Sequence, residues 1–138
     1  MKRRKAREAA LQALYQLDIA GGGDEAAGGA VPAVRGHDRA FTSLLVDGTR
    51  EHLFEIDAMI ERFAEHWSIG RMAVVDRNIL RLAIFELRYY ENTPYRVVID
   101  EAVELAKKFG SEESGAFING ILDSVGKMIP SSTPLTAR

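Results

Sequence analysis

Five of the first seven residues are lysine or arginine, and none of the seven is acidic. The basic residues are Lys2, Arg3, Arg4, Lys5 and Arg7. The whole chain has a formal net charge of -2, so the sequence sets a basic end against an acidic body. Ammonium and guanidinium groups gathered in this way bind phosphates and other anions, which indicates a localised polyanion site. A solvated, frayed terminus is the alternative explanation of the same composition.

A tyrosine follows the basic residues at helical spacing. The segment from about residue 3 to residue 19 has no glycine or proline, and Arg4, Arg7, Leu11 and Tyr15 form one stripe of the predicted helix. Tyrosine stacks on bases and arginine binds phosphates, so the stripe is a candidate base-stacking platform. Alternatively, Leu11 and Tyr15 pack against another helix while the arginines reach water. Both interpretations hold if Leu11 is buried and Tyr15 is half exposed. The opposite face suits close helix packing and consists of Ala6, Ala9, Ala10, Ala13, Leu14 and Leu17.

A carboxylate lies in an apolar part of the next strongly helical region. Glu86 shares its face of the predicted helix with Ile79, Leu82 and Ala83. Burying a carboxylate there requires a cation or backbone donors, so we interpret Glu86 as a structural anchor. The sequence places no second catalytic group at an interpretable spacing, so it does not support a role for Glu86 as a general base. On another face of the same helix, Arg77, Arg81 and Arg88 are explained by solvation or by ion pairs with the acidic body.

The remaining residues predict no catalytic or metal site. His37, His52 and His66 do not follow a metal-ligand pattern, the chain has no cysteine, and no glycine-rich phosphate loop follows a strand. We therefore predict no enzymatic activity, no metal and no cofactor. Polar residues interrupt the segment after the basic run, which excludes a signal peptide, and no apolar run is long enough for a membrane span. These features indicate a soluble, cytoplasmic protein.

Hydrophobic periodicity predicts an all-α fold. Helices are expected over about 3–19, over 41–67 as one helix or as two bent near Gly48, over 74–90, after Pro94 to Phe109, and from a cap at Ser111 to about 129. An apolar share of 46% is enough for the core of one domain over 1–129. The Gly/Ala-rich passage over 21–36 is predicted to be a flexible loop, and 130–138 a disordered tail.

The last predicted helix has two features that bear on binding. Phe117 lies near its N-terminus, where backbone amides and the helix dipole favour an anion such as phosphate. Phe117 is equally explained as the first core residue of the helix. Gly120 lies inside the helix at a cost of about 1 kcal/mol relative to alanine, which close approach of another backbone would justify.

Several ordered motifs resemble the NusB family of transcription antitermination proteins. They are Arg3-Arg4-Lys5-Ala6-Arg7-Glu8, the run from Leu11 to Tyr15, the run from Asp76 to Leu87, Pro94 to Ala102, Ala106 to Gly110 and Phe117 to Asp123. They cover the chain apart from the loop near 20–40 and the tail. The resemblance implies a helical bundle of about six or seven helices in two packed subdomains.

The resemblance also implies a function without catalysis. Family members bind the boxA element of ribosomal RNA leader transcripts together with the ribosomal protein NusE, and the complex promotes processive transcription by RNA polymerase. By position, the RNA contacts would be Lys2, Arg3, Arg4, Arg7 and Tyr15, together with the start of the last helix from Glu113 to Phe117. The candidates for the NusE contact are Asp76 and Arg77. A homodimer that masks the RNA site is compatible with the resemblance.

This chain departs from many family members at Gly115-Ala116, where they carry a basic residue before the phenylalanine. The absence of one phosphate-binding cation would weaken RNA binding and lower its salt dependence by about 0.7 for a single strand. We therefore expect greater reliance on the first helix and on NusE. The sequence leaves two other functions open. One is the helical domain that precedes the catalytic domain of some ribosomal RNA cytosine methyltransferases, which needs an α/β domain after it. The other is a helical scaffold that binds only proteins.

Overall fold

The computed structural model describes residues 2–21, 37–65, 67–90 and 93–128. These residues form six α-helices, one short 3-10 turn (Ile69–Arg71) and one π-helical segment, and no strand occurs among them. The all-α prediction is confirmed. Most of the predicted loop over 21–36 and the whole predicted tail over 130–138 lie outside the described residues. Within the described ranges, no helix is both long enough and apolar enough to cross a membrane.

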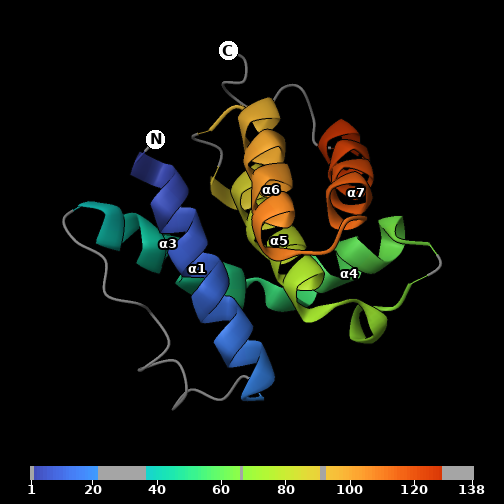
Figure 1. Cartoon of the computed structure of the whole chain (residues 1–138), viewed down its shortest axis with the longest axis horizontal. Helices are drawn as coiled ribbons and strands as arrows, with labels where there is room; N and C mark the ends of the chain where they lie inside the picture. The colour runs from blue at the N-terminus through green and yellow to red at the C-terminus, as the bar shows by residue number, and fades with distance from the viewer. Residues whose placement is uncertain (1, 22–36, 66, 91–92, 129–138) are drawn as a thin grey trace.

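The helices form two groups that share a central helix (Figure 1). Helix α5 (Val74–Phe85) lies in the middle. Helices α1 (Lys2–Ile19) and α3 (His37–Glu51) pack against each other and against one side of α5. On the other side, α6 (Tyr95–Phe109) and α7 (Ser114–Met128) form a hairpin, and α4 (Leu53–Phe63) packs against α5 and α7. This arrangement agrees with the two packed subdomains that the resemblance implies.

The central position of α5 follows from its composition. Every residue from Asn78 to Leu87 is buried, so this stretch is enclosed around its whole circumference rather than along one stripe. The surrounding helices contribute fully buried side chains, each of which stabilises the fold by about 1.5–3 kcal/mol. These side chains include Leu45, Ile56, Ile60, Ile99, Ile118 and Leu122.

Three element boundaries differ from the sequence prediction. The region 41–67 is two helices, but the break falls at His52, whose ring stacks on Tyr89 with centroids 3.8 Å apart. The predicted helix over 74–90 changes after Phe85 into the π-helical segment η2 (Glu86–Tyr90). The last helix begins at Ser114, three residues after the predicted cap at Ser111, whose backbone N–H donates to Ser114 Oγ at 2.9 Å.

Two glycines inside helices have opposite environments. Gly48 is buried in α3, and an added Cβ would overlap the ring of Phe85, so glycine allows α3 and α5 to approach. Gly120 in α7 is exposed, and apart from its chain neighbours and the adjacent backbone of α7, no described atom lies within 4 Å of the position a Cβ would take. The prediction that another backbone approaches Gly120 is therefore wrong.

This contrast predicts opposite effects of the same substitution. Gly48→Ala should lower the free energy of unfolding by about 1–3 kcal/mol, because the buried Phe85 ring must move. Gly120→Ala should leave it unchanged or raise it by up to about 1 kcal/mol, since alanine is the better helix former and the site is open. Urea unfolding followed by circular dichroism measures both. Equal effects of the two changes would contradict the close packing of Phe85 on Gly48.

Candidate nucleic-acid interface

Helix α1 presents its basic residues at the end where a helix least favours them. Ala6, Ala10 and Ala13, with Leu14 and Leu17, are buried in the core, and Ala9 is half-buried. Arg3, Arg4 and Lys5 are exposed. Cations at a helix N-terminus oppose the helix dipole, and α1 has no acidic residue in its first turn. The basic end therefore needs anions from elsewhere in the fold or from a ligand. The side chain of Lys2 lies outside the described part of the structure.

Arg3 rests on an aromatic shelf made of Phe41 and Tyr90. Its guanidinium carbon lies 4.0 Å from the centre of the Phe41 ring, and Nη1 donates a hydrogen bond of 3.1 Å to the Tyr90 hydroxyl. A cation over an aromatic ring at an exposed position gains about 0.5–1 kcal/mol. The shelf restrains Arg3 while leaving it exposed to solvent.

Arg4 is held by a carboxylate of α6. Its Nε and Nη2 donate to the two oxygens of Glu101 at 3.0 and 2.8 Å. The side chain of Arg4 is 46% exposed, whereas that of Glu101 is only 13% exposed. The hydrogen bond from Arg4 holds the pKa of Glu101 below its usual value, although partial burial acts in the opposite direction. No local sequence pattern relates residue 101 to residue 4, so sequence reasoning missed this contact.

Arg7 does not lie on an exposed face as the stripe suggested. It is 4% exposed, and its Nε and Nη2 donate to the two oxygens of the buried Glu86 at 2.7 and 2.8 Å. The physical reason is that this part of the stripe faces η2 and α6 rather than solvent. Leu11 is also buried, while Tyr15 is 37% exposed. The structural interpretation of Glu86 is confirmed, and its cation is Arg7.

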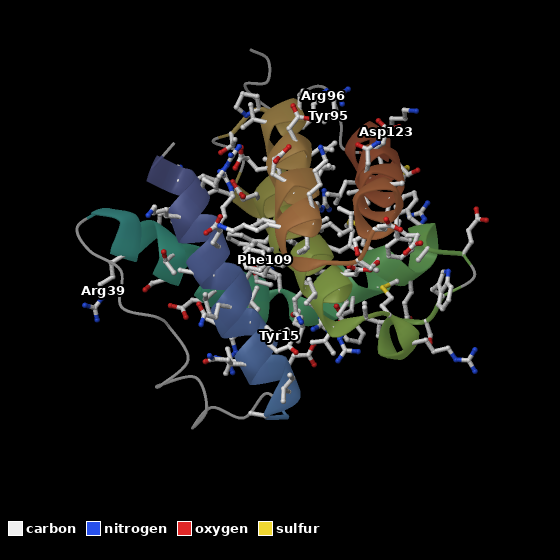
Figure 2. All side chains as sticks on the ribbon, viewed as in Figure 1. Tyr15, Arg39, Tyr95, Arg96, Phe109 and Asp123 are labelled. Carbon is white, nitrogen blue, oxygen red and sulfur yellow. The ribbon has the colours of Figure 1, made fainter. Side chains whose placement is uncertain are left out.

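Tyr15 keeps the exposure that base stacking requires. It lies on the C-terminal half of α1, below the end that carries the basic residues (Figure 2). Among the stripe residues, Arg4 and Tyr15 are thus the two that remain at the surface.

The arginines of α5 form ion pairs within the fold, which was one of the two explanations left open. Arg77 donates twice to Asp18 at 2.7 Å, and Arg81 binds both Asp57 and Asp18. Burial alone would raise the pKa of Asp18, but hydrogen bonds from Arg77 and Asn78 and the charge of Arg81 hold that pKa below its usual value. Arg88 is exposed.

The two candidates for the NusE contact are also engaged internally. Asp76 accepts a hydrogen bond of 2.7 Å from Ser114 Oγ, which ties the start of α5 to the start of α7. Both Asp76 and Arg77 are partly buried. Their role in binding a partner remains a prediction.

An open groove of about 970 Å³ connects the basic end of α1 with the first turn of α7. Arg4 and Glu101 line one part of it, and Gly115 and Ala116 line another. The two predicted halves of the binding site are therefore neighbours. Phe117 is half-buried and packs against the core, as its alternative interpretation held, while Glu113 is exposed. The groove has more carboxylates than cations, and its charged lining residues are Arg4, Lys107, Asp100, Glu101, Glu104 and Glu112.

The fold and this surface define a small all-helical protein that presents cations and an exposed tyrosine on one helix. The sequence profile of the NusB family matches residues 4–127. The chain is 48% identical to the transcription antitermination protein NusB of Geotalea daltonii, over 93% of this chain and 96% of that protein. It is also 48% identical to NusB of Myxococcus xanthus, over 89% of this chain and 93% of that protein. The chain belongs to the NusB family.

Solved structures of the family share the fold. NusB of T. maritima superimposes with a TM-score of 0.86 at 38% identity, covering 94% of each chain. A chain in the crystal structure of the antitermination factors NusB and NusE in complex with double-stranded RNA superimposes with a TM-score of 0.80 at 33% identity. That match covers 91% of this chain and 96% of the other.

The buried Arg7–Glu86 pair predicts a large loss of stability on removal of one partner. Arg7→Met should lower the free energy of unfolding by about 3–5 kcal/mol, because it leaves Glu86 buried without its cation. The double change Arg7→Met with Glu86→Leu should cost clearly less, since no buried charge remains. Arg4→Met, a matched change on the exposed part of α1, should have a much smaller effect. Chemical unfolding checks all three, and a double variant no more stable than Arg7→Met would contradict the assignment.

The lowered pKa of Asp18 predicts a pH-dependent contribution to stability. The stabilisation is present at neutral pH, above the unfolded-state pKa, and is lost as pH falls through the lower folded-state pKa. Asp18→Asn should therefore lower the free energy of unfolding by about 2 kcal/mol at neutral pH, with the difference from the native chain shrinking in acid. Asp123→Asn, at a more exposed carboxylate paired with Lys127, should change it by less than about 1 kcal/mol. Urea unfolding at several pH values tests this, and a pH-independent difference would refute it.

Proposed function

We propose that this chain is an RNA-binding transcription antitermination factor that binds boxA RNA of ribosomal RNA leader transcripts together with NusE. Its membership of the NusB family supports this, since the relatives are transcription antitermination proteins. It acts by binding in the cytoplasm, promotes processive transcription by RNA polymerase, and catalyses no reaction. The methyltransferase-domain alternative has no support from these relatives, because both are transcription antitermination proteins.

The observation that carries the proposal is the exposed basic end of α1. Arg3, Arg4 and Lys5 extend beyond the part of α1 that packs in the core, and α1 gains no helix stability from them. RNA phosphates supply anions to this exposed end, at which Arg4 pairs with Glu101 in the absence of RNA, and Tyr15 on the stripe that contains Arg4 offers a stacking surface for an unpaired base. Together they provide a positioning contact and a base contact on one rigid helix.

The role of Arg7 in this function is indirect. Because its guanidinium is buried and donates two hydrogen bonds to Glu86, it fixes α1 rather than binding phosphate. Lys2 at one end of the surface and Glu113 with Phe117 at the start of α7 complete the proposed RNA contacts. The groove lies between Arg4 and the first turn of α7, where Gly115 and Ala116 line it, which supports the proximity of the two groups of proposed contacts.

NusE is the protein partner in this proposal. A family member of the same fold has been solved with NusE and double-stranded RNA, which supports a joint complex. The start of α5 around Asp76 and Arg77 is the proposed contact region. Because both side chains serve the fold, any contact there uses the surrounding surface and their remaining polar atoms.

A salt titration with boxA RNA and a scrambled control, with and without NusE, tests the proposal. Arg3→Ala with Arg4→Ala should weaken binding and reduce the salt dependence by about 0.7 for each single-strand phosphate that is no longer neutralised. Tyr15→Ala should weaken binding by about 1–3 kcal/mol without changing the salt dependence, because stacking releases no counterions.

The matched control is Arg62→Ala, an exposed arginine on α4. It should leave RNA affinity unchanged. Equal binding of boxA and scrambled RNA, unaffected by the Arg3, Arg4 and Tyr15 changes combined, would require the proposal to be abandoned.

A further inference from the structure

The guanidinium of Arg4 already holds an anion when no RNA is present. Glu101 takes the Nε and Nη2 edge, in which two N–H groups point in parallel. Bidentate binding of a phosphate uses the same geometry. Glu101 therefore already occupies the edge of the Arg4 guanidinium that a phosphate would bind.

The two partners differ in how easily they can separate. Glu101 is mostly buried and fixed on α6, whereas Arg4 is about half exposed on the first turn of α1. A long arginine side chain at the surface can turn toward solvent at little cost. Glu101 would then keep a second cation nearby, because Arg7 Nη1 lies 4.0 Å from its Oε1. The Arg4–Glu101 pair can thus open without leaving a carboxylate alone.

The surrounding charges favour displacement of Glu101 over a bridge in which Arg4 binds Glu101 and phosphate together. Asp100, Glu104 and Glu112 line the same groove, with Lys107 as the second lining cation. A phosphate placed beside the intact pair would face these carboxylates, which repel it. Turning Arg4 out toward solvent moves the contact away from them.

We propose that Glu101 competes with RNA phosphate for Arg4, so that RNA binding opens the Arg4–Glu101 ion pair. Glu101 is therefore a determinant of RNA affinity although it makes no RNA contact itself. This inference rests on the proposed RNA-binding function. It adds a contact within the protein that lowers binding to any phosphate ligand that uses Arg4.

The test is the boxA RNA affinity of Glu101→Gln in the full chain. Removal of the competing charge should tighten binding by about three- to ten-fold at moderate salt. Glu104→Gln is the matched control, since it removes the same charge one helical turn away in the same groove without a hydrogen bond to Arg4. Asp123→Asn is a remote control on α7, on the side away from α1 (Figure 2). Both controls should change affinity by less than about two-fold.

A double-mutant cycle separates competition from a general charge effect. In an Arg4→Ala background, Glu101→Gln should change affinity no more than Glu104→Gln does, because its effect acts through Arg4. Weaker or unchanged binding of Glu101→Gln, or a gain that persists without Arg4, would overturn the inference. Circular dichroism should show that each variant is folded.

The same data distinguish failure of the inference from failure of the proposed function. If the native chain binds boxA RNA and Glu101→Gln binds it no more tightly, only the proposed competition between Glu101 and phosphate is wrong. If neither the native chain nor Glu101→Gln binds the RNA above the scrambled control, the RNA-binding proposal fails and the competition fails with it.

Discussion

The buried ion pair between Arg7 and Glu86 sets the position of α1, on which the rest of the surface depends. An apolar contact between helices tolerates small shifts along the axis, but a two-bond contact between a guanidinium and a carboxylate has one geometry. The pair joins α1 to the segment that follows α5, two elements 79 residues apart in the chain. With Arg7 fixed, the preceding turn can only extend past the core. Arg3 then reaches the Phe41 and Tyr90 rings, and Arg4 reaches Glu101.

The π-helical segment η2 extends this pairing to other parts of the fold. Glu86 continues the α-helical backbone of α5, and a π-helix has more residues in each turn than an α-helix, so the side chains at the end of η2 point in directions that a continuous α-helix would not give. Glu86 faces Arg7, Tyr89 stacks on His52 at the break between α3 and α4, and Tyr90 supports Arg3. Five consecutive residues therefore connect the core, the α3–α4 break and the basic end of α1.

The sequence predicted those features that depend on neighbours three and four residues apart. The helices and the need of Glu86 for a cation both follow from helical periodicity. The identity of that cation does not, because a helical wheel shows that Arg7 and Leu11 share a stripe without showing which element faces it. The break at His52 depends on Tyr89, and the start of α7 depends on side-chain contacts of Ser114 that reach Asp76. Contacts between residues so far apart in the chain cannot be predicted from the local sequence pattern.

The arginines of α1 differ in burial, and this difference gives Arg7 a role in folding and leaves Arg3 and Arg4 for binding. Arg7 is buried and paired with a buried carboxylate, so a ligand could displace Glu86 only by opening the core. Arg4 is half exposed and paired with a carboxylate that has another cation close by, so exchange of its partner is inexpensive. Arg3 is exposed and rests on aromatic rings, which restrain it without neutralising its charge. A phosphate can thus replace Glu101 as the partner of Arg4 in the first turn of α1. It cannot replace Glu86 as the partner of Arg7 one turn later. A single helix can therefore hold its own position through one arginine while offering others of the same type to RNA.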